Sequence, residues 1–101
     1  MAHQLLTQAE IDARARGVHA EWTATTGALS RSIEFADFVT AVEFITLLAP
    51  RCEKLDHHPD LGLHWRRVDV ELSTHSAGGV TGLDFELAEA VDEIAAGLPQ
   101  A

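Results

Sequence analysis

Hydrophobic and polar residues alternate with the two-residue period of a β-strand in two parts of the chain. Residues 29–35 read LSRSIEF and residues 68–75 read VDVELSTH. In the second segment Thr74 falls on the apolar face, and His75 falls on the polar face at the end of the strand. Residues 18–23 also favour a strand, and the Thr-Thr-Gly sequence at 25–27 predicts the turn that follows it.

Two helices are predicted from their capping residues. Thr7 and Glu10 have the spacing of a capping box, so a short helix should run to about Arg16 and end at Gly17. A second capping arrangement, Thr81-Gly82-Leu83-Asp84, should open a helix that runs to about Gly97. Its apolar stripe is Leu83, Leu87, Val91 and Ile94.

A longer helix is predicted between Asp37 and about Cys52, and we expect it to be the main core helix. Its apolar residues recur at helical spacing as Phe38, Val42, Ile45 and Ala49, with Ala41, Phe44 and Leu48 widening the apolar face. Pro50 lies in its last turns, where it lacks an amide hydrogen and crowds the carbonyl four residues earlier. The sequence therefore predicts a kink or an early stop at Pro50.

These elements predict an α+β fold with helices packed on one face of an antiparallel sheet, in a single domain of residues 1–101. We expect the sheet to be four-stranded, with three of its strands located by the pattern. A chain of this length has little core to spare, so we expect self-association. Sixteen acidic residues against seven basic ones give a formal charge of −9, which disfavours direct binding of nucleic acid. No apolar run is long enough to cross a bilayer, so no membrane association is expected. The single cysteine, Cys52, and the lack of a signal-like start favour the cytoplasm.

The candidate chemistry is concentrated between residues 53 and 84. The segment 53–59 reads EKLDHHP, the segment 73–79 reads STHSAGG, and Trp65 and Asp84 complete the set. Imidazoles and carboxylates gathered in this way are typical of a proton-transfer site, because histidine holds either protonation state near neutral pH.

The spacing of these residues is E-x3-H-H-P-x5-W-x9-H-x8-D from Glu53 to Asp84, and it closely resembles the signature of the pterin-4a-carbinolamine dehydratases. Glu21-Trp22, the strand at 29–35 and the helix entry at 35–38 resemble the N-terminal half of the family. Leu61 and Leu63 depart from its usual aromatic and polar residues.

The resemblance implies a cytoplasmic hydro-lyase that dehydrates 4a-hydroxytetrahydropterin in tetrahydrobiopterin recycling, without a cofactor, as a homodimer or homotetramer. It implies three catalytic histidines, with His57 and His75 as the acid–base pair and His58 mainly holding the pterin. It also implies substrate binding by the residues Asp56, His57, His58, Ser73, Thr74, His75 and Ser76. Glu53 and Asp84 would support the imidazoles, although Asp84 also has the position of a helix cap.

Two other functions remain open from the sequence. The first is a zinc site built from the possible ligands Cys52, His57, His58, His64 and His75. Their spacing disfavours it, because adjacent histidines rarely reach one tetrahedral ion. The second is a non-catalytic role on the same fold, since relatives in this family act as a transcriptional dimerisation cofactor or as an enzyme assembly factor.

Overall fold

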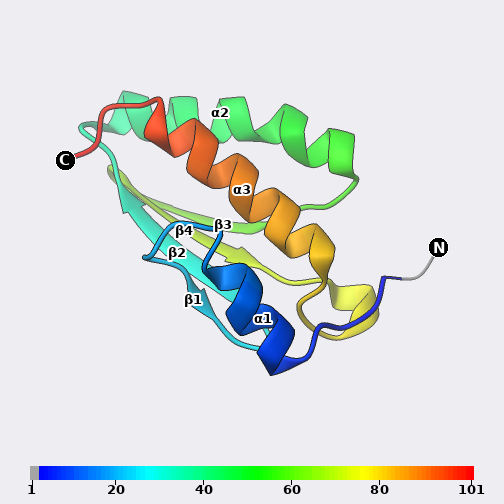
Figure 1. The fold of residues 1–101 in the computed structure, drawn as a ribbon. Helices are drawn as coiled ribbons and strands as arrows, with labels where there is room; N and C mark the ends of the chain where they lie inside the picture. Colours follow the sequence, from blue (N-terminus) through cyan, green and yellow to red (C-terminus); the bar gives the residue numbers. More distant parts are fainter. Residues whose placement is uncertain (1–2) are drawn as a thin grey trace.

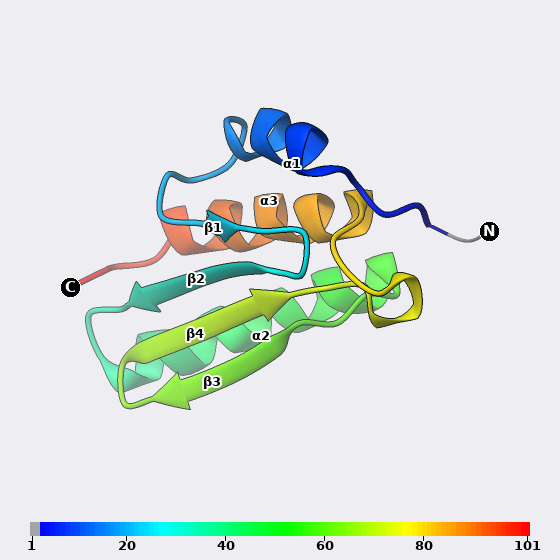
Figure 2. The same cartoon turned by 90° about the horizontal axis from the view of Figure 1, so that it is seen from below.

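The computed structural model describes residues 3–101, which form three α-helices and one four-stranded antiparallel sheet (Figure 1). The elements in chain order are α1 (Gln8–Ala15), β1 (Thr23–Ala24), β2 (Leu29–Glu34), α2 (Phe38–Leu55), β3 (Asp60–His64), β4 (Arg67–Leu72) and α3 (Gly82–Ala96). A short 3₁₀ helix occupies His75–Ala77. The strand order is β1-β2-β4-β3, and α2 and α3 lie on the same face of the sheet (Figure 2). The α+β prediction is confirmed.

The core lies between the inward faces of β2 and β4 and the two long helices. Strand register pairs Leu29 with Leu72 and Ile33 with Val68, so the alternation in both strands places these apolar side chains on one face. The Phe35 ring continues this layer and packs against Phe44 of α2 with ring centroids 5.0 Å apart.

Both predicted capping boxes are present. The Thr7 hydroxyl accepts from the Glu10 amide while the Glu10 carboxylate accepts from the Thr7 amide, and Thr81 and Asp84 repeat the arrangement at α3. Helix α3 ends at Gly97 as expected, and Leu87 and Val91 of its apolar stripe are fully buried.

The strand predicted over residues 18–23 is wrong for most of its length, because β1 contains only Thr23 and Ala24. The backbone before it forms local turns: the Val18 amide donates to Ala15 and the Trp22 amide donates to His19. The Asp92 carboxylate of α3 also accepts from the His19 amide and from the Trp22 indole. These bonds satisfy the backbone locally and outweigh the strand preference of the sequence.

The early stop predicted at Pro50 is also wrong, since α2 continues to Leu55. Position 50 is exposed, so water can satisfy the Thr46 carbonyl that loses its usual amide partner. The extra turn carries Glu53 and places the histidine pair at the end of the helix.

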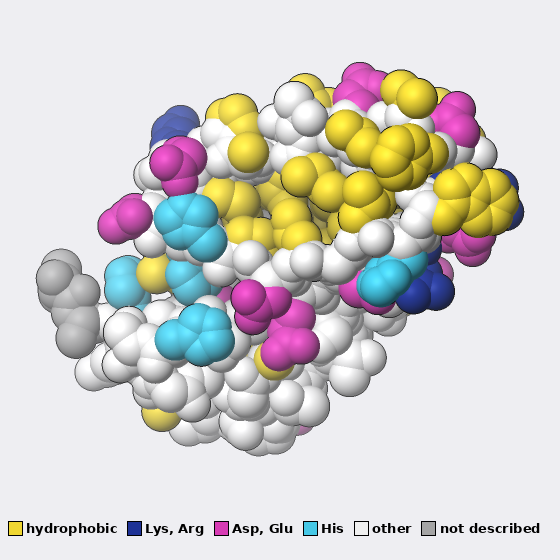
Figure 3. Space-filling model, turned by 180° about the vertical axis from the view of Figure 1, so that it is seen from behind, with side chains coloured by type: hydrophobic (Ala, Val, Ile, Leu, Met, Phe, Trp, Pro, Cys, Tyr) yellow, Lys and Arg dark blue, Asp and Glu magenta, His cyan; other side chains and the backbone are white. Residues whose placement is uncertain are grey.

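Only part of the predicted apolar face of α2 enters the core, namely Ala41, Phe44 and Leu48. Its buried residues are Thr40, Ala41, Phe44, Leu48 and Cys52. Phe38 and Val42 of the predicted stripe are 50% and 40% exposed. The helix therefore has a second apolar face, whose Ile45 and Ala49 line one groove with Leu61 of β3, and Leu63 and Trp65 of the same hairpin are also exposed. Figure 3 shows hydrophobic side chains gathered over this side of the molecule.

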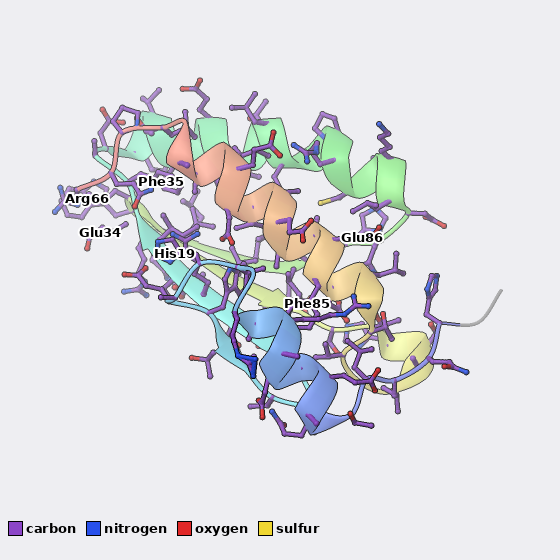
Figure 4. All side chains as sticks on the ribbon, in the orientation of Figure 1. His19, Glu34, Phe35, Arg66, Phe85 and Glu86 are labelled. Carbon is purple, nitrogen blue, oxygen red and sulfur yellow. The ribbon has the colours of Figure 1, made fainter. Side chains whose placement is uncertain are left out.

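Strand β3 was missed as a segment of the sequence, because DLGLH offers only two apolar residues around a glycine and all but Gly62 of its residues are exposed. A two-residue turn, Trp65-Arg66, joins β3 to β4, and Trp65 has a left-handed backbone with φ 54°. Arg66 lies beside Glu34 at this end of the sheet and donates to its carboxylate at 2.9 Å (Figure 4). Since the turn closes one end of the hairpin, residues before Asp60 and after Leu72 meet at the other end.

None of the helices among residues 3–101 is both long and apolar enough to span a membrane.

Candidate functional site

The end of α2 fixes the position of His57. Asp56 follows the helix in the left-handed conformation, with φ 49° and ψ 43°, and its amide donates to the carbonyls of Cys52 and Glu53. The His57 amide donates to the Cys52 carbonyl at 3.1 Å, five residues back. This pairing is that of a Schellman motif, which turns the chain sharply at a helix end. The His57 backbone is therefore held by the helix that precedes it.

The His57 imidazole is bound to a carboxylate in the interior. Its Nε2 lies 2.6 Å from Asp84 Oδ1, and Asp84 is fully buried at the start of α3. Asp84 Oδ2 accepts from the Thr81 amide and from the Thr74 hydroxyl, both at 2.9 Å. Asp84 thus caps α3 and orients His57 at the same time. The Nδ1 atom of His57 has no hydrogen bond to any residue from 3 to 101.

His58 is the exposed member of the pair. Its Nε2 contacts the Oε2 atom of Glu53, in the last turn of α2, and both side chains are largely exposed. Glu53 is therefore the acidic partner of His58, whereas Asp84 is the partner of His57.

His75 begins the short 3₁₀ helix instead of ending a strand, because β4 stops at Leu72. The carbonyl of Thr74 accepts from the amides of Ala77 and Gly78, which turns the chain away from the sheet. The His75 side chain is 83% exposed, and its Nε2 lies 3.9 Å from Asp60 Oδ2.

Asp60 is a candidate residue that the sequence did not reveal. It lies first in β3 opposite Glu71, so it comes near His75 only through the pairing of β3 with β4. Spacing along the chain carries no signal for it, because β3 itself was not recognised.

The remaining predicted substrate-binding residues lie in the segment 73–76 and at the end of α2. The Ser73 hydroxyl donates to the Gly27 carbonyl at 2.9 Å, and the Thr74 hydroxyl lies between Asp84 and Thr81. Ser76 and Asp56 are exposed. The polar groups of Thr74 are thus engaged within the protein, whereas Ser76 and Asp56 are open to a ligand.

The site therefore brings three imidazoles, each beside its own carboxylate, to the open end of the β3–β4 hairpin. Figure 3 shows histidine and acidic side chains gathered at one end of the molecule, next to the hydrophobic area. A groove of about 280 Å³ leads away from His58 and Glu53, with an apolar wall that includes Ile45, Leu48 and Leu61. The arrangement can move protons beside an apolar surface.

Cys52 lines the same groove but is not suited to proton transfer. Burial, with a further contribution from the charge of Glu53, raises the pKa of its thiol above the ordinary value. The thiol therefore stays protonated at neutral pH. Within residues 3–101, no three His, Cys, Asp or Glu side chains are grouped in a way that could hold a metal ion.

Residues 4–94 match the family model described as pterin 4 alpha carbinolamine dehydratase. A protein of Bradyrhizobium is 48% identical over 100 residues, which cover 97% of this chain and 99% of the relative. A protein of Metallosphaera sedula is 42% identical over 89 residues, or 88% of this chain and 92% of the relative. Both carry a provisional name as pterin-4-alpha-carbinolamine dehydratases.

Two solved structures share the fold. The crystal structure of a transcriptional coactivator/pterin dehydratase from Brucella melitensis has a TM-score of 0.83 and 42% identity, and the match covers 89% of this chain and 97% of that one. A pterin dehydratase-like protein identified as a RuBisCO assembly factor in the alpha-carboxysome has a TM-score of 0.60 and 20% identity, over 73% and 86% of the two chains. The second likeness concerns the fold alone. With a family model that spans most of the sequence and relatives above 40% identity, this chain belongs to the pterin-4a-carbinolamine dehydratase family.

Proposed function

We propose that this protein dehydrates a 4a-hydroxytetrahydropterin to the quinonoid dihydropterin and water, as a step in tetrahydropterin recycling. The observation that carries the proposal is the 2.6 Å contact between His57 Nε2 and the fully buried Asp84 carboxylate, in a chain of this family. An imidazole fixed in this way offers its second nitrogen, Nδ1, in a defined direction.

The reaction needs two proton transfers and no electron transfer. The bond between C4a and the hydroxyl oxygen breaks, and that hydroxyl takes a proton and leaves as water. The neighbouring ring nitrogen loses its proton, and a carbon–nitrogen double bond forms. Two imidazoles can supply and accept these protons near neutral pH, so this chain needs no further group for the balance.

The acid–base pair is His57 and His75. His57 is oriented from the interior by Asp84, and His75 comes from the neighbouring loop with Asp60 beside it. His58 points to Glu53 and borders the apolar groove, which suits a role in holding the flat ring system. Asp56 and Ser76, both exposed, can offer polar contacts to the pterin.

The test is to generate the carbinolamine in situ and to follow its dehydration spectroscopically. Positioned acid–base groups typically contribute about 10²–10⁴ in rate, so His57→Ala and His75→Ala should each lose acceleration in that range. His64→Ala is the control, since His64 is exposed like His75 but lies in β3 near the turn of the hairpin. Equal rates in all three variants would contradict the proposal.

We also propose that the protein self-associates through the second apolar face of α2 and the adjoining β3 strand. In a single chain this face leaves Phe38, Val42 and Trp65 substantially exposed, and such contiguous apolar area is typical of an interface.

A non-catalytic binding role on the same fold is the alternative. It would be favoured if the folded wild-type protein did not accelerate dehydration.

A further inference from the structure

The hydroxyls of Thr74 and Thr81 are buried polar groups beside the site that the proposed mechanism does not use. Thr74 is 4% exposed and Thr81 is fully buried, and neither side chain can reach a ligand from its place in the interior. Their oxygens lie 2.8 Å apart. Both connect to Asp84, since the Thr74 hydroxyl and the Thr81 amide reach its Oδ2 atom.

The direction of each hydrogen bond in this cluster follows from counting protons. A hydroxyl has one proton to donate, and an ionised carboxylate can only accept. Thr74 donates its proton to Asp84, so the bond between the two threonines must be donated by Thr81. The Thr81 oxygen then accepts from the Leu83 amide at 3.3 Å. The hydrogen bonds from the Leu83 amide through Thr81 and Thr74 to Asp84 are therefore all donated in the same direction.

The two bonds from Thr74 and Thr81 fix Oδ2, so they leave Oδ1 aimed at His57, and this carboxylate oxygen decides which nitrogen of His57 carries the proton. Asp84 Oδ2 already accepts two bonds, and Oδ1 faces His57 Nε2 at 2.6 Å. Because the carboxylate can only accept there, Nε2 must hold the proton in the neutral imidazole. The Nδ1 atom is then left with its lone pair, which is the form of a general base.

We propose that Thr74 and Thr81 are positioning residues that hold His57 in the Nε2–H tautomer through Asp84, so that Nδ1 enters the reaction as the proton acceptor. The role of Nδ1 rests on the proposed function, whereas the tautomer is a property of the ligand-free protein. His75 is then left to protonate the departing hydroxyl.

The experiment is ¹⁵N NMR of the imidazole signals at about pH 8.5, well above the ordinary histidine pKa of about 6.5, in wild type, Thr74→Val, Thr81→Val and the two Ser variants. The wild type should show His57 protonated at Nε2. Thr74→Val keeps the shape of the side chain but removes a hydroxyl that fixes Oδ2, so the carboxylate can turn away from His57 Nε2. The Nδ1–H tautomer should then become measurably populated, and the dehydration rate should fall at least tenfold. Thr81→Val should act in the same direction with a smaller effect.

The serine variants separate positioning from packing, because serine retains the hydroxyl and loses only a methyl group. Thr74→Ser and Thr81→Ser should restore the wild-type tautomer and most of the rate. An unchanged His57 spectrum in both valine variants, with only lower stability, would overturn the proposal. Failure of the proposed function has a different result, namely no acceleration by wild type, whatever tautomer His57 adopts.

Discussion

At the level of single residues, the proposed role of His57 depends on the charge of Asp84. Its two oxygens accept three bonds, from Thr74, Thr81 and His57, and all three donors are buried or nearly so. An amide in its place has one accepting oxygen and one donating nitrogen. If the oxygen keeps the two threonine bonds, the nitrogen opposes the proton on His57 Nε2.

Asp84→Asn should therefore lower the dehydration rate by about 10²–10⁴, because His57 must change tautomer to pair with an amide. The same exchange behind the catalytic histidine of a serine protease lowers kcat by about 10⁴. The cap of α3 is retained, so the variant should stay folded by circular dichroism. Glu86→Gln, an exposed carboxyl on the same helix (Figure 4), is the control and should keep the wild-type rate. A rate near wild type for Asp84→Asn would remove Asp84 from the mechanism.

The sequence predicted some residues of the candidate site and missed others. Those it missed are brought together by contacts between segments that the motif spacing does not describe. The spacing between Glu53 and Asp84 identified four candidate residues whose side chains do pair in the structure, Glu53 with His58 and His57 with Asp84. Asp60 was missed because it meets His75 only through the register of β3 and β4. The hydrogen bond from the Thr74 hydroxyl to Asp84 was not predicted either. Alternation in a strand shows which face is buried but not what a hydroxyl contacts there.

At the level of elements, α2 begins at a carboxylate cap. Hydrogen bonds from Thr40, first from its hydroxyl and then from its amide, hold the pKa of Asp37 below its ordinary value of 3.8. A carboxyl whose pKa is lower in the folded state contributes stability above about pH 4, and this contribution is lost as the pH falls through the folded-state pKa.

Asp37→Asn should therefore reduce the loss of stability between about pH 5 and pH 3, while changing stability at pH 7 very little because asparagine is an equally good cap. Urea denaturation at the two pH values measures this. Glu43→Gln on the same helix, whose carboxylate bonds to no residue among 3–101, should keep the wild-type pH dependence. The same slope in wild type and Asp37→Asn would show that the cap does not contribute.

Helix α3 contributes to the core through residues that are remote from the proposed chemistry. Leu87 is fully buried, so Leu87→Ala should cost about 2–5 kcal/mol of the free energy of unfolding. Its rate per folded molecule should be close to that of wild type, measured at low denaturant. Glu89→Ala, exposed on the same helix, should change stability by less than about 0.5 kcal/mol. A large loss of rate in folded Leu87→Ala would mean that α3 positions the site more directly.

The helices were more predictable than the strands for a physical reason. Capping boxes at Thr7 and Thr81 are local, so the sequence contains the whole signal. Strand β1 was misplaced because the bonds of Asp92 to residues 19 and 22 arise from α3, about seventy residues away. The core face of α2 was predicted only in part, because the helix is apolar over a wider arc than one sheet can cover: Phe44 and Leu48 are buried, whereas Phe38 and Val42 are exposed.

At the level of the whole molecule, this wide apolar arc is the strongest sign of an assembly. Val42→Glu places a charge in the second apolar face of α2 and should shift the protein to a smaller species by analytical ultracentrifugation, since a buried unpaired charge is costly. Leu47→Glu is a matched control, because Leu47 is similarly exposed but lies beside Arg51 and Glu93 instead. A monomeric wild type, or equal shifts in both variants, would contradict association through this face.

The central claim is that two imidazoles at one end of this fold dehydrate a pterin carbinolamine. Stopped-flow absorbance of the freshly generated carbinolamine, with wild type and with the His57→Ala/His75→Ala double variant, tests it most directly. The account predicts clear acceleration by wild type and a rate near the uncatalysed reaction with the double variant, folded by circular dichroism. A folded wild type that leaves the uncatalysed rate unchanged, or a double variant as fast as wild type, would contradict it.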